Sequence, residues 1–525
     1  MKFNQKATET NITTNYMGGK AYTLTPAMEL YTAVVATMLD NIYYEKANDR
    51  LERIQKLIAK NDPTFVAKLA VYTREKMYLR SAPVVLAVEL AKHHKGDDLV
   101  SKLVNRVVQR ADEITEILSY YAIANNRKGI KTLGKLSKQI QKGLAMAFQK
   151  FDEYQFAKYN RDTSVKLRDA LFLVHPKGKD DAQQNLFNKI VSDTLDTPYT
   201  WETQLSALGN QTFANEAEKQ LAKAILWEEL MESGKIGYMA TLRNLRNICL
   251  QGTEKALDMA LNLITNEVQV RKSKQLPFRY LSAYSEIEKI NEQDMVFPEK
   301  KAKVTDILKA LEKAVSYSIE NLPELAGKTL ILTDNSGSMR GDGGGASLVS
   351  AMSKRTTADI ANLFAALYWK KANNSLVGLF GDRLIMPNMK PDMDVFTAFK
   401  HINKEATQCG ASTETGIFEM FDKLIRDKIV IDRIVIFSDC QVGTGCIWYD
   451  HKGNRGDSFN ALFQKYKKEI NPNVLTYSVD LKGYGNTLFK EGVMTVAGWS
   501  DKIFDMMHAL ETAGSIESEI NKIEL

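Results

Sequence analysis

The stretch that decides the fold of the second part of the chain is K-T-L-I-L-T-D-N-S-G-S-M, residues 328–339. Its apolar run, residues 328–333, predicts a β-strand. The strand leads into Asp334, and Ser336 and Ser338 follow at two-residue spacing. One carboxylate and two hydroxyls at the mouth of a strand could form a nucleophile with helpers, a phosphate cradle, a metal site or only a polar turn.

Downstream of this stretch, short apolar runs alternate with amphipathic helices. The predicted strands are residues 375–381, 432–439 and 474–481, and the predicted helices are residues 356–372, 413–428, 459–470 and 498–512. Strands that alternate with helices are typical of a mostly parallel, doubly wound α/β sheet. We therefore expect residues 326–525 to form a Rossmann-like α/β domain.

Two further polar side chains belong with the opening motif. Asp439 ends another predicted strand, and Thr413 lies in the loop G-A-S-T-E-T-G at residues 410–416. Ligands of open α/β sheets bind at the carboxyl ends of the strands. Two carboxylates and three hydroxyls are hard oxygen ligands, which suit Mg²⁺ or Mn²⁺ and not zinc. The predicted metal ligands are Asp334, Ser336, Ser338, Thr413 and Asp439.

The competing interpretations of the motif fit the residues less well. A phosphate-binding P-loop needs a Lys after its glycines, and G-D-G-G-G-A-S precedes none. Phosphatases with an aspartyl nucleophile usually carry a second Asp two residues on, where this chain has Ser336. A serine hydrolase needs G-x-S-x-G and a well-placed His. A polar turn explains the motif alone, but not its match with Thr413 and Asp439.

The motif D-x-S-x-S, followed by a loop Thr and a strand-end Asp, resembles the metal-ion-dependent adhesion site of von Willebrand factor A domains. The resemblance covers roughly residues 327–525. It implies that Asp334, Ser336 and Ser338 bind the metal directly, and that Thr413 binds it directly or through a water molecule. Asp439 would support these ligands without contacting the metal. Ser412 is a less favoured alternative to Thr413. It also implies an open coordination position for a partner's carboxylate, so that the site binds and does not catalyse.

The first part of the chain has a different pattern. From residue 25 to about 320, apolar residues recur at spacings of three and four, as in residues 26–44, 62–77, 82–94 and 218–234. This pattern predicts an α-solenoid or a helical bundle over residues 1–325. Residues 286–326, rich in Glu and Lys, are the expected junction with the α/β domain.

The composition is that of an ordinary globular protein, with 44% hydrophobic and 26% charged residues. No apolar stretch approaches the roughly 18 residues needed to span a bilayer. The polar N-terminus does not look like a signal peptide. The four Cys residues show no zinc spacing. We therefore expect a cytoplasmic protein with free thiols and no membrane partner.

The net charge of +6 is unevenly distributed along the chain. Residues 101–150 contain 10 Lys and Arg against 3 Asp and Glu, and residues 117–151 contain no acid. The basic residues Lys131, Lys135, Lys138 and Lys142 follow the spacing i, i+4, i+7, i+11, so a helix would place them on one face. Such a face predicts a polyanion, and RNA or DNA is the natural candidate; a solvated surface is the alternative.

Just downstream, residues 151–179 mix cations, aromatic rings and an imidazole. Aromatic side chains among cations can stack on unpaired bases. The residues that form this mixture are Lys158, Tyr159, Arg161, Lys166, Arg168 and His175. The alternative for His175 is a satisfied loop histidine before Pro176.

The segments K-G-L-A-M-A-F-Q-K-F-D-E-Y-Q-F-A-K-Y, R-D-A-L-F-L-V-H-P-K and A-T-L-R-N-L-R-N-I resemble the TROVE domain of Ro ribonucleoproteins. The resemblance implies HEAT-like helical repeats bent into a ring that the A domain closes. It implies that small structured Y RNAs bind outside, that single-stranded ends of misfolded RNAs enter the hole, and that an exoribonuclease can be tethered through RNA. Lys158 and His175 match family positions that bind Y RNA, whereas Asp162 occupies a family arginine position, with Arg161 one place earlier.

We therefore expect a non-enzymatic, Ro-type RNA-binding protein with a Mg²⁺-dependent docking site for a carboxylate-bearing protein. The alternatives are a protein-interaction scaffold that uses both domains and, less favoured, a metal-dependent phosphohydrolase with Asp334 as nucleophile.

Overall fold

The computed structural model describes most of the 525-residue chain. The described residues are 11–36, 42, 44–127, 135–275, 277–293, 298–319, 327–341, 347–349, 355–372, 374–412, 415–443, 449, 452, 458–498, 502–513 and 515–525. Within them, no helix is long and apolar enough to cross a membrane.

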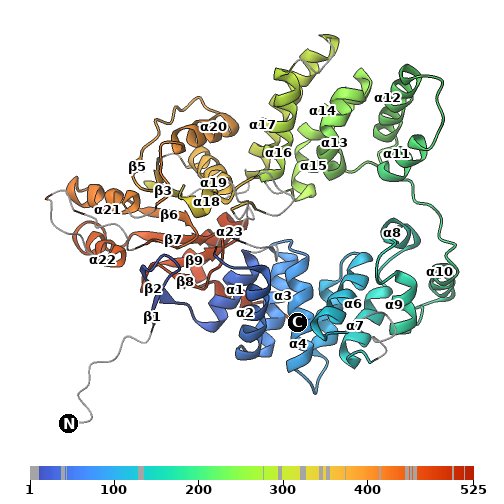
Figure 1. Ribbon diagram of the computed structural model, residues 1–525, viewed down its shortest axis with the longest axis horizontal. Coiled ribbons are helices and arrows are strands. Elements are labelled where there is room, and N and C mark those ends of the chain that lie inside the picture. Colours follow the sequence, from blue (N-terminus) through green and yellow to red (C-terminus); the bar gives the residue numbers. More distant parts are fainter. Residues whose placement is uncertain are drawn as a thin grey trace.

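Helices dominate the first part of the chain, as the sequence predicts. A first arm comprises α1 (Pro26–Val35), α2 (Ala47–Lys60), α3 (Pro63–Glu75), α4 (Ser81–His93), α5 (Leu99–Val107), α6 (Asp112–Ala124), α7 (Lys138–Phe148), α8 (Glu153–Tyr159), α9 (Leu167–Val174) and α10 (Asp181–Ser192). A second arm comprises α11 (Trp201–Gly209), α12 (Glu216–Glu232), α13 (Tyr238–Gln251), α14 (Glu254–Thr265), α15 (Glu267–Ser273), α16 (Pro277–Glu292) and α17 (Lys301–Ile319). Residues 193–200 connect the two arms (Figure 1).

Local sequence signals explain several helix starts. The Thr25 hydroxyl accepts a hydrogen bond from the Met28 backbone N–H, with Pro26 in the first turn. The Asp62 carboxylate caps α3 in the same way through the Phe65 N–H, and Pro63 follows it. Both caps confirm the predicted starts.

Two sequence expectations about the helical part are corrected. The predicted helix over residues 26–44 ends at Val35, and residues 37–41 and 43 lie outside the described part. The expected junction at residues 286–326 contains α17, a long helix with one buried side. Val304, Ile307, Leu311 and Val315 recur at helical spacing and are buried, so their burial outweighs the high charge of this segment.

The second part of the chain is an α/β unit with a six-stranded sheet. Its strands are β3 (Thr329–Asp334), β4 (Ser375–Phe380), β5 (Leu384–Ile385), β6 (Arg433–Ser438), β7 (Leu475–Asp480) and β9 (Met494–Ala497), in the order β5-β4-β3-β6-β7-β9. All pairs are parallel except β4 with β5. The predicted mostly parallel sheet is therefore present, although β5 and β9 were not predicted.

Helices cover both faces of this sheet. They are α18 (Gly337–Arg340), α19 (Thr357–Lys371), α20 (Val395–Ala406), α21 (Gly416–Arg426), α22 (Phe459–Glu469), α23 (Lys502–Ala513) and α24 (Ile516–Asn521). Successive side chains of β3 point to opposite faces of the sheet and therefore contact different layers of helices. Ile331 packs with α19 and α20, whereas Leu330 and Leu332 pack with α21 and α22.

An N-terminal hairpin joins the two ends of the sequence. Its strands β1 (Ile12–Thr14) and β2 (Lys20–Thr23) were not predicted, and β2 pairs with β8 (Asn486–Thr487) in a second, three-stranded sheet. The Asn15 side chain donates to the Val442 carbonyl at 2.7 Å, and the Tyr16 N–H donates to the Gln441 side chain at 2.8 Å. The hairpin thus packs against the α/β unit, across the expected boundary near residue 325.

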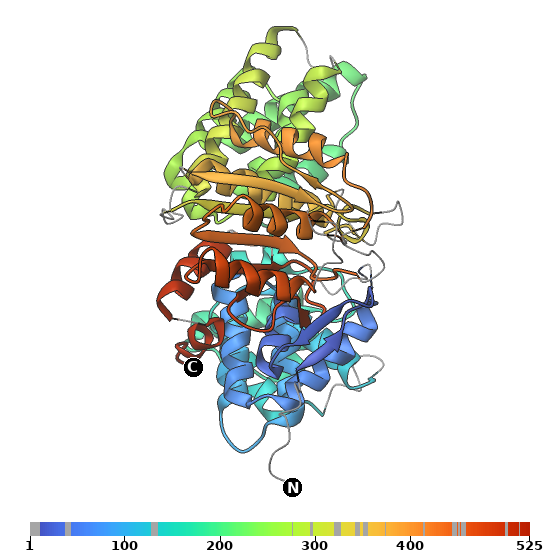
Figure 2. The same cartoon turned by 90° about the vertical axis from the view of Figure 1, so that its left-hand side faces the viewer.

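Both arms contact the α/β unit. In the first arm, α1 packs on β9 and α3 packs on α24; in the second arm, α16 packs on α19 and α17 packs on α20. Figure 2 shows the sheet between the two arms. Whether the repeats are HEAT-like stays a prediction of the family resemblance.

Candidate metal centre and basic surface

The two predicted carboxylates lie at neighbouring strand ends. β3 ends at Asp334, and Asp439 directly follows β6. Because these strands pair in parallel, their carboxyl ends share one edge of the sheet. Asp334, Ser336, Ser338 and Asp439 are all buried. The structure therefore brings four of the five predicted ligands to one edge.

Hydrogen bonds order the motif around Asp334. Its Oδ1 accepts from the Ser336 N–H at 3.0 Å, and its Oδ2 accepts from the Ser438 hydroxyl at 2.7 Å. The hydroxyl oxygens of Ser336 and Ser338 are 3.2 Å apart. Ser438 was missed by sequence reasoning, because the last residue of a buried strand carries no distinguishing signal.

The electrostatics of the site favour a bound cation. Burial and the nearby charge of Asp439 raise the pKa of Asp334 to about 7. Burial also raises the pKa of Asp439, whose Oδ2 is buried without a hydrogen-bond partner among the described residues. The two buried carboxylates repel each other when both are charged. A divalent cation would satisfy both the excess charge and the unpaired oxygen.

The donor set limits the choice of cation. Within the described part of the chain, no three His, Cys, Asp or Glu side chains converge as a zinc or iron site would require. Two carboxylates with serine hydroxyls fit Mg²⁺ or Mn²⁺ instead. Thr413 lies outside the described residues. Its loop reaches the motif nonetheless, because the Ala411 carbonyl accepts from the Gly337 N–H at 2.7 Å.

Lys482 is a charged neighbour that the sequence did not indicate. It is fully buried, just beyond the end of β7. Burial lowers its pKa to about 8, against the opposing charge of Asp439. A buried ammonium near Asp439 balances part of the negative charge behind the site, while the charge of Asp439 still acts on Asp334.

The basic face predicted over residues 131–142 is not a single helical face. α7 begins at Lys138, Lys135 precedes it, and Lys131 lies outside the described residues. Only Lys138 and Lys142 share the helix, where both are exposed. The physical reason is the start of α7 after Ser137, whose backbone is not helical, with φ −55° and ψ 129°. Lys135 is exposed before this helix start.

Three cations on α8, α9 and their connecting loop are free of carboxylate partners among the described residues. The nearby acids have other roles: Glu153 pairs with Lys189 and Asp162 pairs with Lys166. Asp152 and Asp169 cap helix starts. These cations are Lys158, Arg161 and Arg168, and all three are exposed, as is the imidazole of His175. His175 ends α9 in a left-handed conformation with φ 52°.

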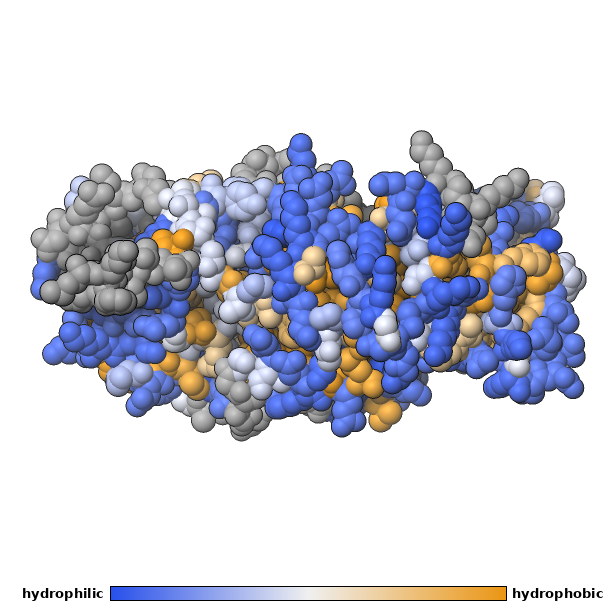
Figure 3. All heavy atoms as spheres, turned by 90° about the horizontal axis from the view of Figure 1, so that it is seen from below, coloured by the Kyte–Doolittle hydropathy of each residue, from blue (hydrophilic) through white to orange (hydrophobic). Residues whose placement is uncertain are grey.

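Exposed aromatic rings accompany these cations. Tyr154 is 45% exposed and Phe172 is 53% exposed. Lys158 lies 5.7 Å from the centre of the Tyr154 ring, and Arg168 lies 5.9 Å from that of Phe172. Tyr159, by contrast, packs against the core with Arg110 over its ring. From below, the molecular surface is mainly hydrophilic, with apolar side chains between (Figure 3).

Comparison with known protein families assigns the chain to one of them. The TROVE domain profile matches residues 22–207 and 193–307, which is more than half of the chain. The chain belongs to the TROVE-domain family. The two overlapping matches meet where residues 193–200 connect the arms of this TROVE-domain protein.

Two curated relatives of the TROVE-domain chain are large proteins. Telomerase protein component 1 of Mus musculus is 24% identical over 355 residues, and that of Rattus norvegicus is 23% identical over 355 residues. These matches cover 51% of this chain but 13% of each relative. The chain therefore spans a small part of those proteins.

A solved structure supports the fold of the TROVE-domain protein. The crystal structure of the Deinococcus radiodurans Ro (RSR) protein superposes with a TM-score of 0.58 and 15% identity. The match covers 92% of this chain and 99% of that one. The helical arms and the α/β unit thus share one overall architecture with the Ro protein.

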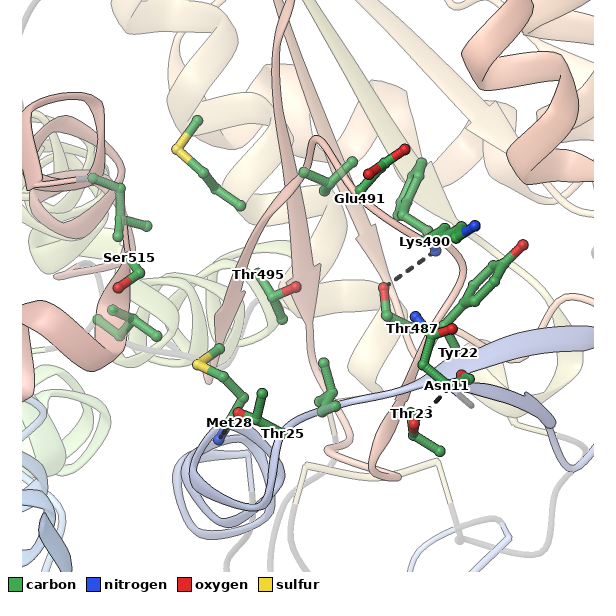
Figure 4. A pocket seen from close by; sticks show the side chains of 16 residues that line it. Asn11, Tyr22, Thr23, Thr25, Met28, Thr487, Lys490, Glu491, Thr495 and Ser515 are labelled. Atoms are coloured by element: carbon green, nitrogen blue, oxygen red, sulfur yellow. Dashed lines mark hydrogen bonds between the residues drawn. The ribbon is translucent and has the colours of Figure 1, made fainter. Parts of the chain in front are cut away.

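A separate cavity of about 420 Å³ lies at the junction of the N-terminal hairpin and the α/β unit. Figure 4 shows Thr23 and Thr25 on one side of it, and Thr487 and Thr495 on strands of the other. None of the predicted metal or RNA residues lines this cavity.

Proposed function

We propose that this TROVE-domain protein is a non-enzymatic RNA-binding protein of the Ro type. The observation that carries the proposal is the surface of α7–α9. There Lys158, Arg161 and Arg168 are exposed and have no carboxylate partner among the described residues, and two exposed rings lie beside them. Lysines and arginines neutralise phosphates, and aromatic rings stack on unpaired bases. The candidate contacts remain Lys131, Lys135, Lys138, Lys142, Lys158, Arg161 and His175, to which the structure adds Arg168, Tyr154 and Phe172.

We infer the RNA classes from the resemblance to Ro ribonucleoproteins. A small structured Y-like RNA would bind the outer surface of the first arm, and single-stranded ends of misfolded RNA would enter between the arms. This activity would serve non-coding RNA quality control in the cytoplasm. A Y-like RNA would also tether an exoribonuclease.

The α/β unit would act as a von Willebrand factor A-like docking domain. Asp334, Ser336, Ser338 and Thr413 would hold Mg²⁺ or Mn²⁺, with Asp439 supporting them. The cation would supply a Lewis-acidic position for the carboxylate of a protein partner. The buried carboxylates and the unpaired Asp439 Oδ2 support this assignment.

Charge reversal on α7 tests the RNA proposal. We expect Lys138→Glu with Lys142→Glu to weaken binding of a structured RNA at least tenfold, and to reduce the slope of log affinity against log salt by about 1 to 2. The measurement is a fluorescence binding titration at several salt concentrations.

The matched control is Lys465→Glu with Lys468→Glu. These two exposed lysines lie on α22 of the α/β unit and make the same change in net charge. Equal RNA affinity and equal salt slope in the natural chain and the α7 variant would overturn the proposal. A similar loss in the α22 variant would show a net-charge effect only.

A further inference from the structure

A chain of buried amide side chains leads away from the metal centre. Asn335, which lies between the candidate ligands Asp334 and Ser336, is 2% exposed, and Asn362 on α19 is fully buried. The two amides pair reciprocally: Asn335 Nδ2 donates to Asn362 Oδ1 at 3.2 Å, and Asn362 Nδ2 donates to Asn335 Oδ1 at 2.9 Å. Asn335 Nδ2 also lies 3.2 Å from the Thr333 carbonyl.

The chain continues to α20. Asn362 Nδ2 donates to Asn403 Oδ1 at 2.7 Å, and Asn403 Nδ2 donates to Asp359 Oδ1 at 3.2 Å. Asp359 in turn belongs to the capping box that starts α19. Buried amides are costly unless they are paired, and a fully paired network holds its members in one arrangement. These contacts therefore fix Asn335, and with it the backbone of the ligand loop, relative to α19 and α20.

The outer side of α20 contacts the second arm. The rings of Phe396 on α20 and Tyr284 on α16 have centroids 4.5 Å apart. Lys400 on α20 forms an ion pair with Glu288 on α16 and lies 4.8 Å from the Tyr284 ring centre. One helix thus contacts both the amide chain and the helical arm.

We propose that Asn335, Asn362 and Asn403 are positioning residues that couple metal binding to the contact between α20 and α16. The inference rests on the proposed metal site. A cation that fixes Asp334 and Ser336 would also fix Asn335, and the paired amides would transmit this order to α20. Coupling of this kind is reciprocal: docking of the second arm would strengthen metal binding by the same factor by which metal strengthens docking.

Magnesium affinity of the full chain tests the positioning role. We expect Asn362→Ala to weaken Mg²⁺ binding about tenfold to a hundredfold in calorimetry, as removal of outer-sphere partners does in other metal sites. The double variant Asn335→Ala with Asn362→Ala should lose little more Mg²⁺ affinity than either single variant, because the two amides act through each other. Additive losses, or an unchanged Asn362→Ala affinity, would overturn the proposal.

The matched control is Asn471→Ala. Asn471 is a half-buried amide of the same α/β unit that donates to the Ile431 carbonyl, at the other end of the sheet. Its Mg²⁺ affinity should equal that of the natural chain. The half-buried Asn403→Ala supplies a second test if Asn362→Ala folds poorly, with an expected loss of about fivefold.

Hydrogen exchange tests the coupling to the arm. In the natural chain, Mg²⁺ should slow the exchange of backbone amides in α16. Asn403→Ala should abolish this slowing even at a Mg²⁺ concentration that saturates the variant. Lys400→Ala should weaken Mg²⁺ binding from outside the amide chain. If Mg²⁺ binds but leaves α16 unchanged, the coupling is refuted; if the natural chain does not bind Mg²⁺ at all, the proposed metal site itself fails.

Discussion

At the scale of single residues, the charged form of Asp334 is disfavoured in the folded chain when no cation is bound. Burial and the charge of Asp439 raise its pKa from 3.8 to about 7. Between pH 3.8 and about pH 7, the Asp334 carboxyl group is therefore protonated in the folded state and deprotonated in the unfolded state. The contribution of this group to the free energy of unfolding is fully present below about pH 4 and is lost as the pH rises through 7.

The first prediction concerns the pH dependence of unfolding. In EDTA, the free energy of unfolding of the natural chain should fall between pH 4 and pH 8, by on the order of 1.4 kcal/mol per unit of pKa difference. Saturating Mg²⁺ should reverse the fall at pH 8, because the cation binds the charged carboxylates. Asp334→Asn should make the fall in EDTA smaller and abolish the Mg²⁺ effect; part of the fall should remain, because burial also raises the pKa of Asp480 to about 6. Denaturant titrations at several pH values provide the measurement.

Asp392→Asn is the control for this prediction, because Asp392 is exposed in the same unit. It should retain both the pH profile and the response to Mg²⁺. A natural chain whose stability in EDTA does not fall with pH would contradict the electrostatic account of the site.

The residues of the metal centre differ in how far sequence could predict them. Asp334 and Asp439 were predictable because a strand followed by a carboxylate is a local signal, and parallel strands align their ends. Ser438, Lys482 and Asn362 were not, because each reaches the site through pairing between segments distant in sequence. Arg161 and His175 were identified as candidates from local composition, but only the structure shows that neighbouring acids are engaged elsewhere.

At the scale of elements, α7 combines a tight core contact with a basic outer side. Gly143 faces α5, where a Cβ atom would lie 2.6 Å from Val104 Cβ and 2.7 Å from the Ser101 carbonyl oxygen. The absent side chain lets the two helices approach closely. Lys138 and Lys142 are exposed on the same helix.

The second prediction is that Gly143→Ala destabilises the protein. Alanine favours helix by up to about 1 kcal/mol, but the clash with the α5 backbone should outweigh this gain and lower the unfolding free energy by about 1–3 kcal/mol. RNA affinity should fall as α7 shifts. Thermal unfolding and the RNA titration give the two readouts.

Gly209→Ala at the end of α11 is the matched substitution in open space, since nothing lies within 4 Å of its Cβ. It should be neutral or slightly stabilising. Equal behaviour of the two variants would show that the α5–α7 contact is looser than described.

The element scale also shows where periodicity misleads. Lysines at helical spacing from residue 131 predicted one basic face, but spacing alone cannot locate a helix start, and α7 begins only at Lys138. The four longer strands β3, β4, β6 and β7 were predicted closely. The short edge strands β5 and β9 were not, because they carry too few residues to show a pattern.

At the scale of the whole molecule, arginine side chains of the first arm donate hydrogen bonds to backbone carbonyls of the α/β unit. Arg50 on α2 is fully buried, pairs with Glu45 at 2.6 Å and donates to the Lys482 carbonyl at 2.5 Å. Arg53 donates to the Gly483 carbonyl at 2.7 Å. Gly483 has φ +66°, and α1 approaches it so closely that a Cβ would lie 2.4 Å from the Thr32 carbonyl oxygen.

The third prediction is that Arg50→Met loosens this junction. Removing one partner of a buried ion pair should cost about 3–5 kcal/mol, toward the lower end because Arg53 still pairs with Glu45. Chemical denaturation should report the loss, and small-angle scattering should show a larger radius of gyration.

Lys56→Met on the same helix serves for comparison. Its contact with Glu52 is long, at 4.0 Å, and exposed, so the change should stay within about 0.5 kcal/mol. An Arg50→Met protein as stable and compact as the natural one would show that the junction does not depend on this contact.

The pairing of β2 with β8 also has a consequence for synthesis on the ribosome. Tyr22 meets Thr487 in that sheet, so the N-terminal strand is made long before its partner exists. At about 5–20 residues per second, roughly half a minute to a minute and a half separates the two. During that interval the nascent hairpin has an unpaired strand edge, which is the kind of surface that chaperones cover. The last strands to emerge therefore complete a structure that the first residues began.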